Sequence, residues 1–125
     1  MKEKFETKNA PIPSGNISQV IISNNFVFIS GLISQKPDGQ IIYNSSIADQ
    51  TKLILSNLKN ILQDMGLSLD NIVRTEIYLS SMKDFDEMNK VYSEFFTMNT
   101  PPARRCVGGE IWGNLGIEIS TIAHL

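Results

Sequence analysis

Along the sequence, the spacing of apolar residues switches repeatedly between the helical period of about 3.6 residues and the strand period of about two. This switching is the strongest constraint on the fold. Two segments place apolar side chains at helical spacing, residues 46–65 and 84–96. The segments around them alternate apolar and polar side chains or form short apolar runs, as strands do. The strands are expected over residues 18–23, 26–31, 41–43, 71–80, 103–108 and 115–123. The expected order is therefore β-β-β-α-β-α-β-β, with the third strand short.

Local signals mark the ends of these elements. Ser23-Asn24-Asn25 predicts the tight turn of an antiparallel hairpin, because asparagine tolerates the left-handed conformation. Ser46 is placed to cap the first helix and Gly66 to end it. Asp84 and Glu87 have the spacing of a capping box at the start of the second helix.

The order of the elements predicts an α+β fold in a single domain, residues 1–125, with one mixed sheet. Right-handed crossovers through the two helices place both helices on the same face of that sheet. The other face is left bare, yet Phe26-Val27-Phe28-Ile29 is apolar at consecutive positions, so both sides of that strand need burial. A second copy of the chain is the most economical cover. We therefore expect a homo-oligomer, with sites at the contacts between subunits.

Composition narrows the class of protein. A chain of 125 residues with 42% hydrophobic and 19% charged residues is ordinary for a soluble globular domain. Its net charge of -2 gives no general attraction to nucleic acid or to an anionic membrane, and no stretch approaches the roughly 18 apolar residues of a membrane span. Cys106 is the only cysteine, so no intrachain disulfide forms. A reducing compartment, the cytoplasm, is expected.

The familiar catalytic and cofactor motifs are missing from the sequence. One histidine and one cysteine cannot assemble the usual zinc ligand sets, so no metal is expected. There is no phosphate-binding loop, dinucleotide fingerprint or nucleophile elbow, and no cofactor is expected. His124 lies next to last, where chain ends fray, which argues against a serine or cysteine nucleophile with a histidine base.

The stretch TPPARRCVGG, residues 100–109, concentrates positive charge at the start of an expected strand. Neighbouring side chains of a strand point to opposite faces, so Arg104 and Cys106 share one face and Arg105 points to the other. From spacing alone, two solvated surface cations explain the arginines better than a binding role does. Cys106 taken alone is a small buried hydrophobic residue.

Four other candidates also have simple structural explanations. Glu118 lies between Ile117 and Ile119 as the polar side of an amphipathic strand. Ser30 and Gly31 end a strand, and Asn89 interrupts an apolar helix face, where most asparagines satisfy nearby backbone groups. These explanations stay open as long as each residue is taken separately.

Taken together and in order, six segments resemble the RidA family of reactive-intermediate deaminases, also called the YjgF or L-PSP family. The segments are APIPSGNISQ, FVFISGLI, QTKLILSNLKNILQDMGLSLDNIVRTEIYL, MKDFDEMNKVYSEFF, PPARRCV and GIEISTIA. The resemblance extends from about Ala10 to Ala123. It implies a chorismate mutase-like fold, a mixed sheet with two helices on one face. It also implies a homotrimer with a central β-barrel and ligand sites in the clefts between subunits.

The resemblance also implies an activity, the hydrolysis of 2-imino acids such as 2-iminobutanoate and 2-iminopropanoate, or their enamine tautomers, to 2-oxo acids and ammonia. No metal or cofactor takes part. The arginine of the family's P-A-R motif is Arg104, which would hold the substrate carboxylate through its planar fork. The family's late glutamate is Glu118, which would orient or deprotonate the attacking water. The backbone at Cys106 would contact the reacting atom. Further cleft positions fall on Ser30, Gly31 and Asn89.

The chain departs from the family at two places, both on the rim of the pocket. Where the family usually has G-P-Y-S-Q, this chain has Ile17 in place of the tyrosine. Ile17 still walls the pocket but neither stacks nor donates a hydrogen bond. The usual Leu-Pro turn between the last two strands is replaced by EIWGNLG, with a turn at Gly113-Asn114.

Three functions remain open from the sequence. The first is the imine deaminase, and the second is a non-enzymatic binder or sensor of small carboxylates with the same fold. The third is the endoribonuclease or translation inhibitor attached to the L-PSP name. The pI near 5.3, the lack of a basic stripe and the single histidine argue against RNA cleavage. The expected partners are further copies of the chain and a 2-imino or 2-oxo acid, with no membrane and no nucleic acid.

Overall fold

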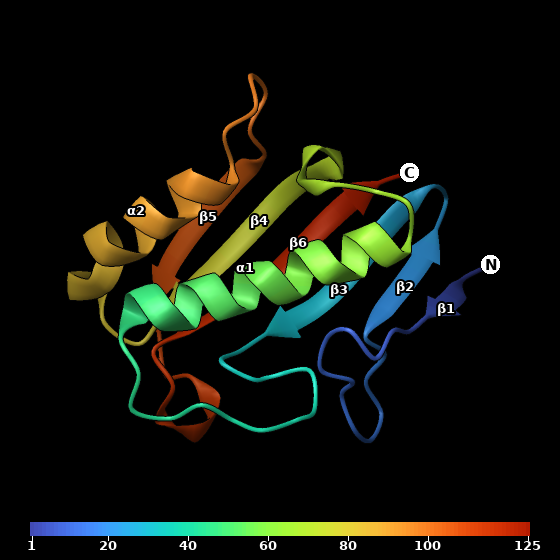
Figure 1. Cartoon of the computed structure of the whole chain (residues 1–125). Helices are drawn as coiled ribbons and strands as arrows, with labels where there is room; N and C mark the ends of the chain where they lie inside the picture. Colours follow the sequence, from blue (N-terminus) through green and yellow to red (C-terminus); the bar gives the residue numbers. More distant parts are fainter.

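The computed structural model describes residues 1–125 as two layers, a six-stranded sheet and two helices packed on one of its faces (Figure 1). The strand order is β1-β2-β3-β6-β4-β5. The strands are β1 Glu3–Phe5, β2 Val20–Ser23, β3 Phe26–Leu32, β4 Ile72–Leu79, β5 Ala103–Gly108 and β6 Ile117–His124. The helices are α1 Ile47–Asp64 and α2 Phe85–Phe95, with short 3-10 turns at Leu69–Asn71, Met82–Asp84 and Trp112–Asn114.

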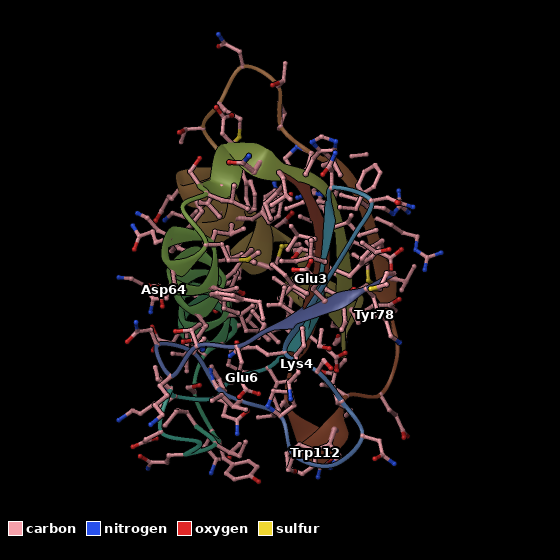
Figure 2. All side chains as sticks on the ribbon, turned by 90° about the vertical axis from the view of Figure 1, so that its right-hand side faces the viewer. Glu3, Lys4, Glu6, Asp64, Tyr78 and Trp112 are labelled. Atoms are coloured by element: carbon pink, nitrogen blue, oxygen red, sulfur yellow. The ribbon has the colours of Figure 1, made fainter.

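The sheet is mixed, and both helices cross on the same face, as predicted. β4 and β5 run parallel, and all other neighbouring strands run antiparallel. α1 connects β3 to β4 and α2 connects β4 to β5 (Figure 1). Viewed from the side, Asp64 lies with the helices and Tyr78 lies on the opposite side of the sheet (Figure 2). The sheet therefore has one covered face and one open face.

The core lies between the sheet and the helices. α1 turns a continuous apolar face towards the sheet, and burial of each large side chain stabilises the fold by about 1.5–3 kcal/mol. Its fully buried members are Ile54, Leu55, Leu58, Ile61 and Leu62. The predicted ends of α1 are confirmed, because the Ser46 side chain accepts a hydrogen bond of 3.0 Å from the Asp49 N–H and Gly66 has a φ of 76°. Neither helix combines the length and the apolar character needed to cross a lipid bilayer.

The start of α2 differs from the prediction of a capping box. The Asp84 side chain makes no capping hydrogen bond, and Ser81 instead caps the turn that precedes the helix. The Glu87 carboxylate accepts a hydrogen bond of 2.8 Å from the Ala48 N–H in the first turn of α1. The acidic residue of the expected box thus joins the two helices.

Two strand predictions were wrong in detail. Residues 41–43 form no strand; an isolated bridge pairs Ile41 with Gln35. Backbone hydrogen bonds of 2.9 Å from the Ile42 N–H to the Ser34 carbonyl and from the Lys36 N–H to the Gln40 carbonyl hold this short turn. The last strand begins at Ile117, two residues later than expected, after the buried Leu115.

The N-terminal segment adds a strand that the sequence analysis did not predict. β1 pairs with β2 at the edge of the sheet. The chain then passes to the end of α1, where the Asp64 carboxylate accepts hydrogen bonds from Thr7 and Asn9. These two bonds, that of Thr7 first, hold the pKa of Asp64 below its usual range.

The open face of the sheet carries large apolar side chains. Val27 and Ile29 are buried against the helices, whereas Phe26 is 39% and Phe28 43% exposed on the other face. Phe26 also packs edge-on against His124, with ring centroids 5.1 Å apart. The bare face expected from the sequence is therefore confirmed.

One position of β4 departs from simple strand alternation. Alternation would place Val73 on the same face as the buried Thr75, but Val73 is 42% exposed. The register with β6 shifts between Ile72 and Arg74, so Ile72 takes the buried place and Val73 is turned out.

Candidate functional site

Arg104 lies on β5 at the covered face of the sheet. It is paired in register with the buried Thr75 of β4, which places its side chain beside α2. Its Nη1 donates a hydrogen bond of 2.6 Å to Oδ1 of Asn89. The guanidinium carbon also lies 4.7 Å from the centre of the Tyr92 ring and 5.6 Å from that of Phe85. Cation–π attraction and the hydrogen bond together orient the guanidinium.

The charge of Arg104 has no acidic partner in the chain. Arg105 points to the opposite face, where its Nη2 lies 3.9 Å from a Glu76 carboxylate oxygen that also pairs with Arg74 at 3.2 Å. No carboxylate oxygen lies within 4.0 Å of the Arg104 guanidinium. The guanidinium instead lines a shallow hollow of about 310 Å³. An oriented, exposed and uncompensated guanidinium can bind a carboxylate through two parallel hydrogen bonds.

Cys106 lies on the same face as Arg104, which confirms the predicted alternation along the strand. It is paired in register with the buried Ile77 and is half-buried itself. Burial raises the pKa of the Cys106 thiol, and the nearby charge of Arg104 lowers it by less. The thiol is therefore protonated at neutral pH, which disfavours a role as nucleophile.

Glu118 lies on β6, at the open face of the sheet. It is paired in register with Tyr78, three positions along β4 from the partner of Arg104, and its side chain is half-buried. Burial raises the pKa of the Glu118 carboxyl above its ordinary value. The carboxylate lies against Gly31, where an added β-carbon would overlap its oxygen. Gly31 therefore allows a close approach that no other residue would permit.

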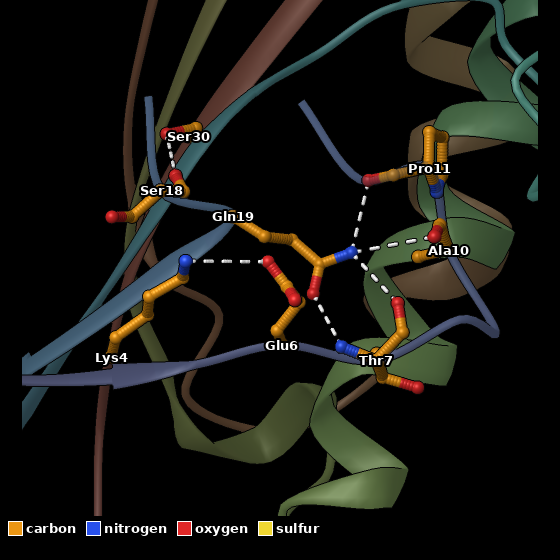
Figure 3. Close-up of polar contacts among 8 residues, drawn as sticks. All are labelled: Lys4, Glu6, Thr7, Ala10, Pro11, Ser18, Gln19 and Ser30. Carbon is orange, nitrogen blue, oxygen red and sulfur yellow. Dashed lines mark hydrogen bonds and ion pairs between the residues drawn. The ribbon is translucent and has the colours of Figure 1, made fainter. Parts of the chain in front are cut away.

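A cavity of about 340 Å³ opens beside Glu118. We call it the glutamate cavity; its lining includes Ile17, Ser30, Gly31, Trp112 and Glu118. The Ser30 hydroxyl donates a hydrogen bond of 2.6 Å to the Ser18 carbonyl oxygen, so it is turned towards the segment that precedes β2 (Figure 3). The size is within the usual range for small-molecule sites.

Gln19 fastens the wall of the glutamate cavity. Its buried side-chain amide accepts a hydrogen bond of 2.8 Å from the Thr7 N–H. It donates to the carbonyl oxygens of Thr7 at 3.1 Å, Ala10 at 3.3 Å and Pro11 at 2.9 Å (Figure 3). Because Pro11 lines the cavity, this amide fixes both the N-terminal segment and one side of the site. This role of Gln19 was not predicted; its only signal in the sequence is its position two residues after Ile17.

The structure brings the predicted site residues together in two separate groups. The first group, the arginine cluster, consists of Asn89, Arg104 and Cys106 at the covered face. The glutamate cavity holds the others, with Glu118 on the open face. Paired residues share a face, and Thr75 and Tyr78 are an odd number of positions apart, so their partners Arg104 and Glu118 lie on opposite faces. A single chain does not place both groups on one small ligand.

The aromatic floor of the arginine cluster was not predicted. Phe85, Asn89 and Tyr92 recur at helical spacing, so they share one face of α2. Tyr92 is further anchored by a hydrogen bond of 2.9 Å between its hydroxyl and that of Thr75. The spacing from Asn89 was the signal that pointed to these rings.

The fold places the chain among α+β proteins with one mixed sheet and two helices on one face. Comparison with known proteins gives the family. The family model described as endoribonuclease L-PSP matches residues 7–125. The chain is 40% identical over 124 residues to RutC family protein PH0854 of Pyrococcus horikoshii, covering 99% of this chain and 98% of that protein. It is 34% identical over 124 residues to the chloroplastic Reactive Intermediate Deaminase A of Arabidopsis thaliana, covering 99% of this chain and 66% of that protein.

A solved structure gives the same result. The crystal structure of yeast Mmf1 matches with a TM-score of 0.92 and 38% sequence identity, covering 99% of this chain and 98% of that chain. The chain therefore belongs to the L-PSP family, which includes the RutC and reactive-intermediate deaminase proteins. The resemblance seen in the sequence is confirmed.

Proposed function

We propose that the protein hydrolyses reactive 2-imino acids and their enamine tautomers to 2-oxo acids and ammonia. The observation that supports this proposal is the state of Arg104, which is oriented by Asn89 and two rings yet has no acidic partner. A receptor of this kind suits the carboxylate that every 2-imino acid carries. A relative named as a reactive intermediate deaminase supports the same activity.

The proposed reaction uses one water molecule and the chain's own residues, without a metal or cofactor. Arg104 holds the substrate carboxylate. The Glu118 carboxylate accepts a proton from water as the water oxygen bonds to the imine carbon. That proton passes to the imine nitrogen, which leaves a hydroxyl and an amino group on the same carbon. The hydroxyl proton then moves through Glu118 to the amino nitrogen, the carbonyl bond forms as the carbon–nitrogen bond breaks, and ammonia leaves together with the 2-oxo acid. The raised pKa of Glu118 favours proton transfer from water, because its carboxylate binds a proton more strongly than an ordinary glutamate does.

We further propose that the site is shared between subunits of a homotrimer. Arg104 and Glu118 lie on opposite faces of one sheet, so the arginine cluster of one subunit would meet the glutamate cavity of its neighbour. The open faces would turn inwards as a β-barrel. The exposed rings of Phe26 and Phe28 support this arrangement, because burying each of them would contribute about 1.5–3 kcal/mol.

Mixing two inactive variants tests the shared site. Arg104→Ala and Glu118→Gln are each expected to be inactive. After dissociation and reassembly of an equal mixture, most trimers contain both variants and each of these has one intact site, so about a quarter of wild-type activity returns. Absence of recovery, in mixtures shown by native mass spectrometry to contain mixed oligomers, would place the site within one chain.

A kinetic assay separates the enzyme from a carboxylate-binding protein. The imine is generated in the cuvette by oxidation of an amino acid, and the appearance of 2-oxo acid is followed. An enzyme accelerates this step, and a thousandfold gain corresponds to about 4 kcal/mol. A sensor would bind a 2-oxo acid through Arg104 without accelerating the reaction. RNA cleavage retained by an Arg104→Ala protein free of other nucleases would favour the third function.

The cytoplasm stays a prediction for the compartment, since the Arabidopsis relative is named as chloroplastic.

A further inference from the structure

The two departures from the family pattern meet in one place. Ile17, from the loop before β2, and Trp112, from the short turn before β6, both line the glutamate cavity together with Glu118. Trp112 lies at one end of the molecule, where the turn closes that end (Figure 2). The sequence separates these residues widely, and only the fold shows that the lost ring and the added ring belong to the same site.

The turn holds Trp112 outward. Ile111 before it and Leu115 after it are 9% and 1% exposed, so both ends of the turn are anchored in the protein. Gly113 and Asn114 take left-handed conformations with φ of 69° and 56°, which reverses the chain within two residues. Trp112 itself is 63% exposed. Its exposure thus follows from the turn and not from a loose chain end.

The lining of the cavity combines one ionisable group, Glu118, with the exposed apolar side chains of Ile17 and Trp112. The other polar side chains of the lining already donate to backbone carbonyl oxygens, namely Gln19, Ser30 and Gln35. With the reacting carbon next to Glu118, the substrate side chain would share the rest of the cavity with Ile17 and Trp112. Ile17 offers no hydrogen bond and the indole offers a flat apolar face with a single donor, so a polar side chain would lose water without adequate replacement. An apolar side chain would instead displace water from two exposed hydrophobic surfaces.

We propose that Trp112 provides an aromatic wall in place of the tyrosine that the family usually has at the position of Ile17. We further propose that Trp112 selects 2-imino acids with large apolar side chains over 2-imino acids with small side chains. This inference rests on the proposed function. The preferred substrates are the imines formed from branched-chain aliphatic or aromatic amino acids. Packing of one added apolar group in a pocket is worth about 1–3 kcal/mol, which is roughly 10- to 200-fold in discrimination.

Fluorescence tests the contact directly, because Trp112 is the only tryptophan of the chain. The stable product analogues 4-methyl-2-oxopentanoate and 2-oxopropanoate serve as probes for a large and a small side chain. Saturable change of tryptophan emission is expected with the large acid, at a concentration about tenfold lower than with the small one. The Arg104→Ala protein is expected to show no change. This readout does not depend on turnover.

Kinetics with matched variants test the selection. Trp112→Ala is expected to lower kcat/KM for the imine of leucine about tenfold and for the imine of alanine less than about twofold. Trp112→Phe should restore most of the loss, since a ring returns. Ile12→Ala is the control, because Ile12 is an exposed apolar residue outside the glutamate cavity.

The outcomes separate this inference from the proposed function. Equal loss for both imines in Trp112→Ala would overturn the selection by Trp112. Unchanged emission at concentrations where calorimetry shows Arg104-dependent binding would also overturn it, while the proposed function would stand. Failure of the wild-type protein to bind either acid or to accelerate hydrolysis of either imine would overturn both.

Discussion

Asn89 accepts a 2.6 Å hydrogen bond from Arg104, and this contact ties the direction of the guanidinium to the position of α2. Truncating Asn89 leaves the charge of Arg104 in place but removes the hydrogen bond that orients the guanidinium. We expect Asn89→Ala to raise KM about three- to tenfold, since a hydrogen bond to a charged group is worth about 1 kcal/mol or more. Asn89→Asp should weaken substrate binding at least as much, because its carboxylate would occupy Arg104. A normal KM in both variants would show that Asn89 does not position the arginine.

Arg104 and Arg105 form a matched pair of neighbours with different expected roles. Arg104→Ala should weaken binding of a 2-oxo acid by about 1.5–3 kcal/mol, roughly 10- to 150-fold, because a charge-assisted contact is lost. Arg105→Ala removes an exposed ion pair with Glu76 and a long hydrogen bond of 3.4 Å to the Tyr78 hydroxyl, together worth about 1 kcal/mol or less of stability. Calorimetric titration measures the binding, and size-exclusion chromatography checks the assembly. Comparable weakening in the two variants would remove Arg104 from the site.

The raised pKa of Glu118 gives a pH dependence with a definite sign. Burial disfavours the ionised carboxylate, so the folded protein keeps this proton in a pH range, above 4.5, where the unfolded chain has lost it. The free energy of unfolding therefore falls as pH rises through that range. Glu118→Gln should remove this fall, so it should be more stable than wild type above the range and similar below it. Urea unfolding at fixed protein concentration over a pH series measures the difference.

The same titration should appear in the activity. Glu118 must be ionised to accept a proton from water, so kcat/KM should rise with pH through an apparent pKa above the ordinary glutamate value. An acid limb that survives unchanged in Glu118→Gln would assign the titration to another group.

Replacing Gly31 tests whether the position of the Glu118 carboxylate is critical for activity. In Gly31→Ala the new methyl group overlaps the Glu118 carboxylate, which must swing away. We expect activity to fall by about tenfold or more, while stability changes by only about 1 kcal/mol because the displaced group is a side-chain end. Gly109→Ala is the control, since an added β-carbon there meets no atom within 4 Å. Full activity in Gly31→Ala would mean that the position of Glu118 is not critical.

Replacing Gln19 is expected to lower the stability of the protein. Gln19→Leu leaves buried backbone groups of the N-terminal segment without partners, and we expect a loss of about 2–4 kcal/mol in the free energy of unfolding. Ser18→Ala, which keeps the carbonyl that binds Ser30, should change stability by about 0.5 kcal/mol or less. Denaturant unfolding of the two variants gives the comparison. A loss in Gln19→Leu no greater than that in Ser18→Ala would contradict the role of the amide.

The parts of the fold that follow from local chemistry could be predicted. Ser46 caps α1 because a hydroxyl at that position bonds the next turn. Arg104 and Arg105 separate to opposite faces because the side chains of a strand alternate. The uncovered face followed from Phe26 and Phe28 at alternate positions of a strand whose first four residues are all apolar.

The parts that depend on distant neighbours could not be predicted. Glu87 leaves its expected capping box because the Ala48 N–H of another helix competes for its carboxylate. The outward turn of Val73 depends on a register shift with a strand far along the chain. Likewise, the meeting of Ile17 and Trp112 in one cavity depends on the path of loops, and no periodicity encodes that path.

A permanently charged guanidinium kept uncompensated at the edge of a sheet does not discriminate strongly among simple anions. Citrate, acetate and phosphate from a buffer offer oxygen atoms of the same kind as a substrate, and they should occupy Arg104 in competition with it. Apparent affinities will therefore depend on the buffer anion as well as on ionic strength. Arg104 alone therefore selects weakly among anions, and in the proposed site between subunits Ile17 and Trp112 would add selectivity for the rest of the ligand.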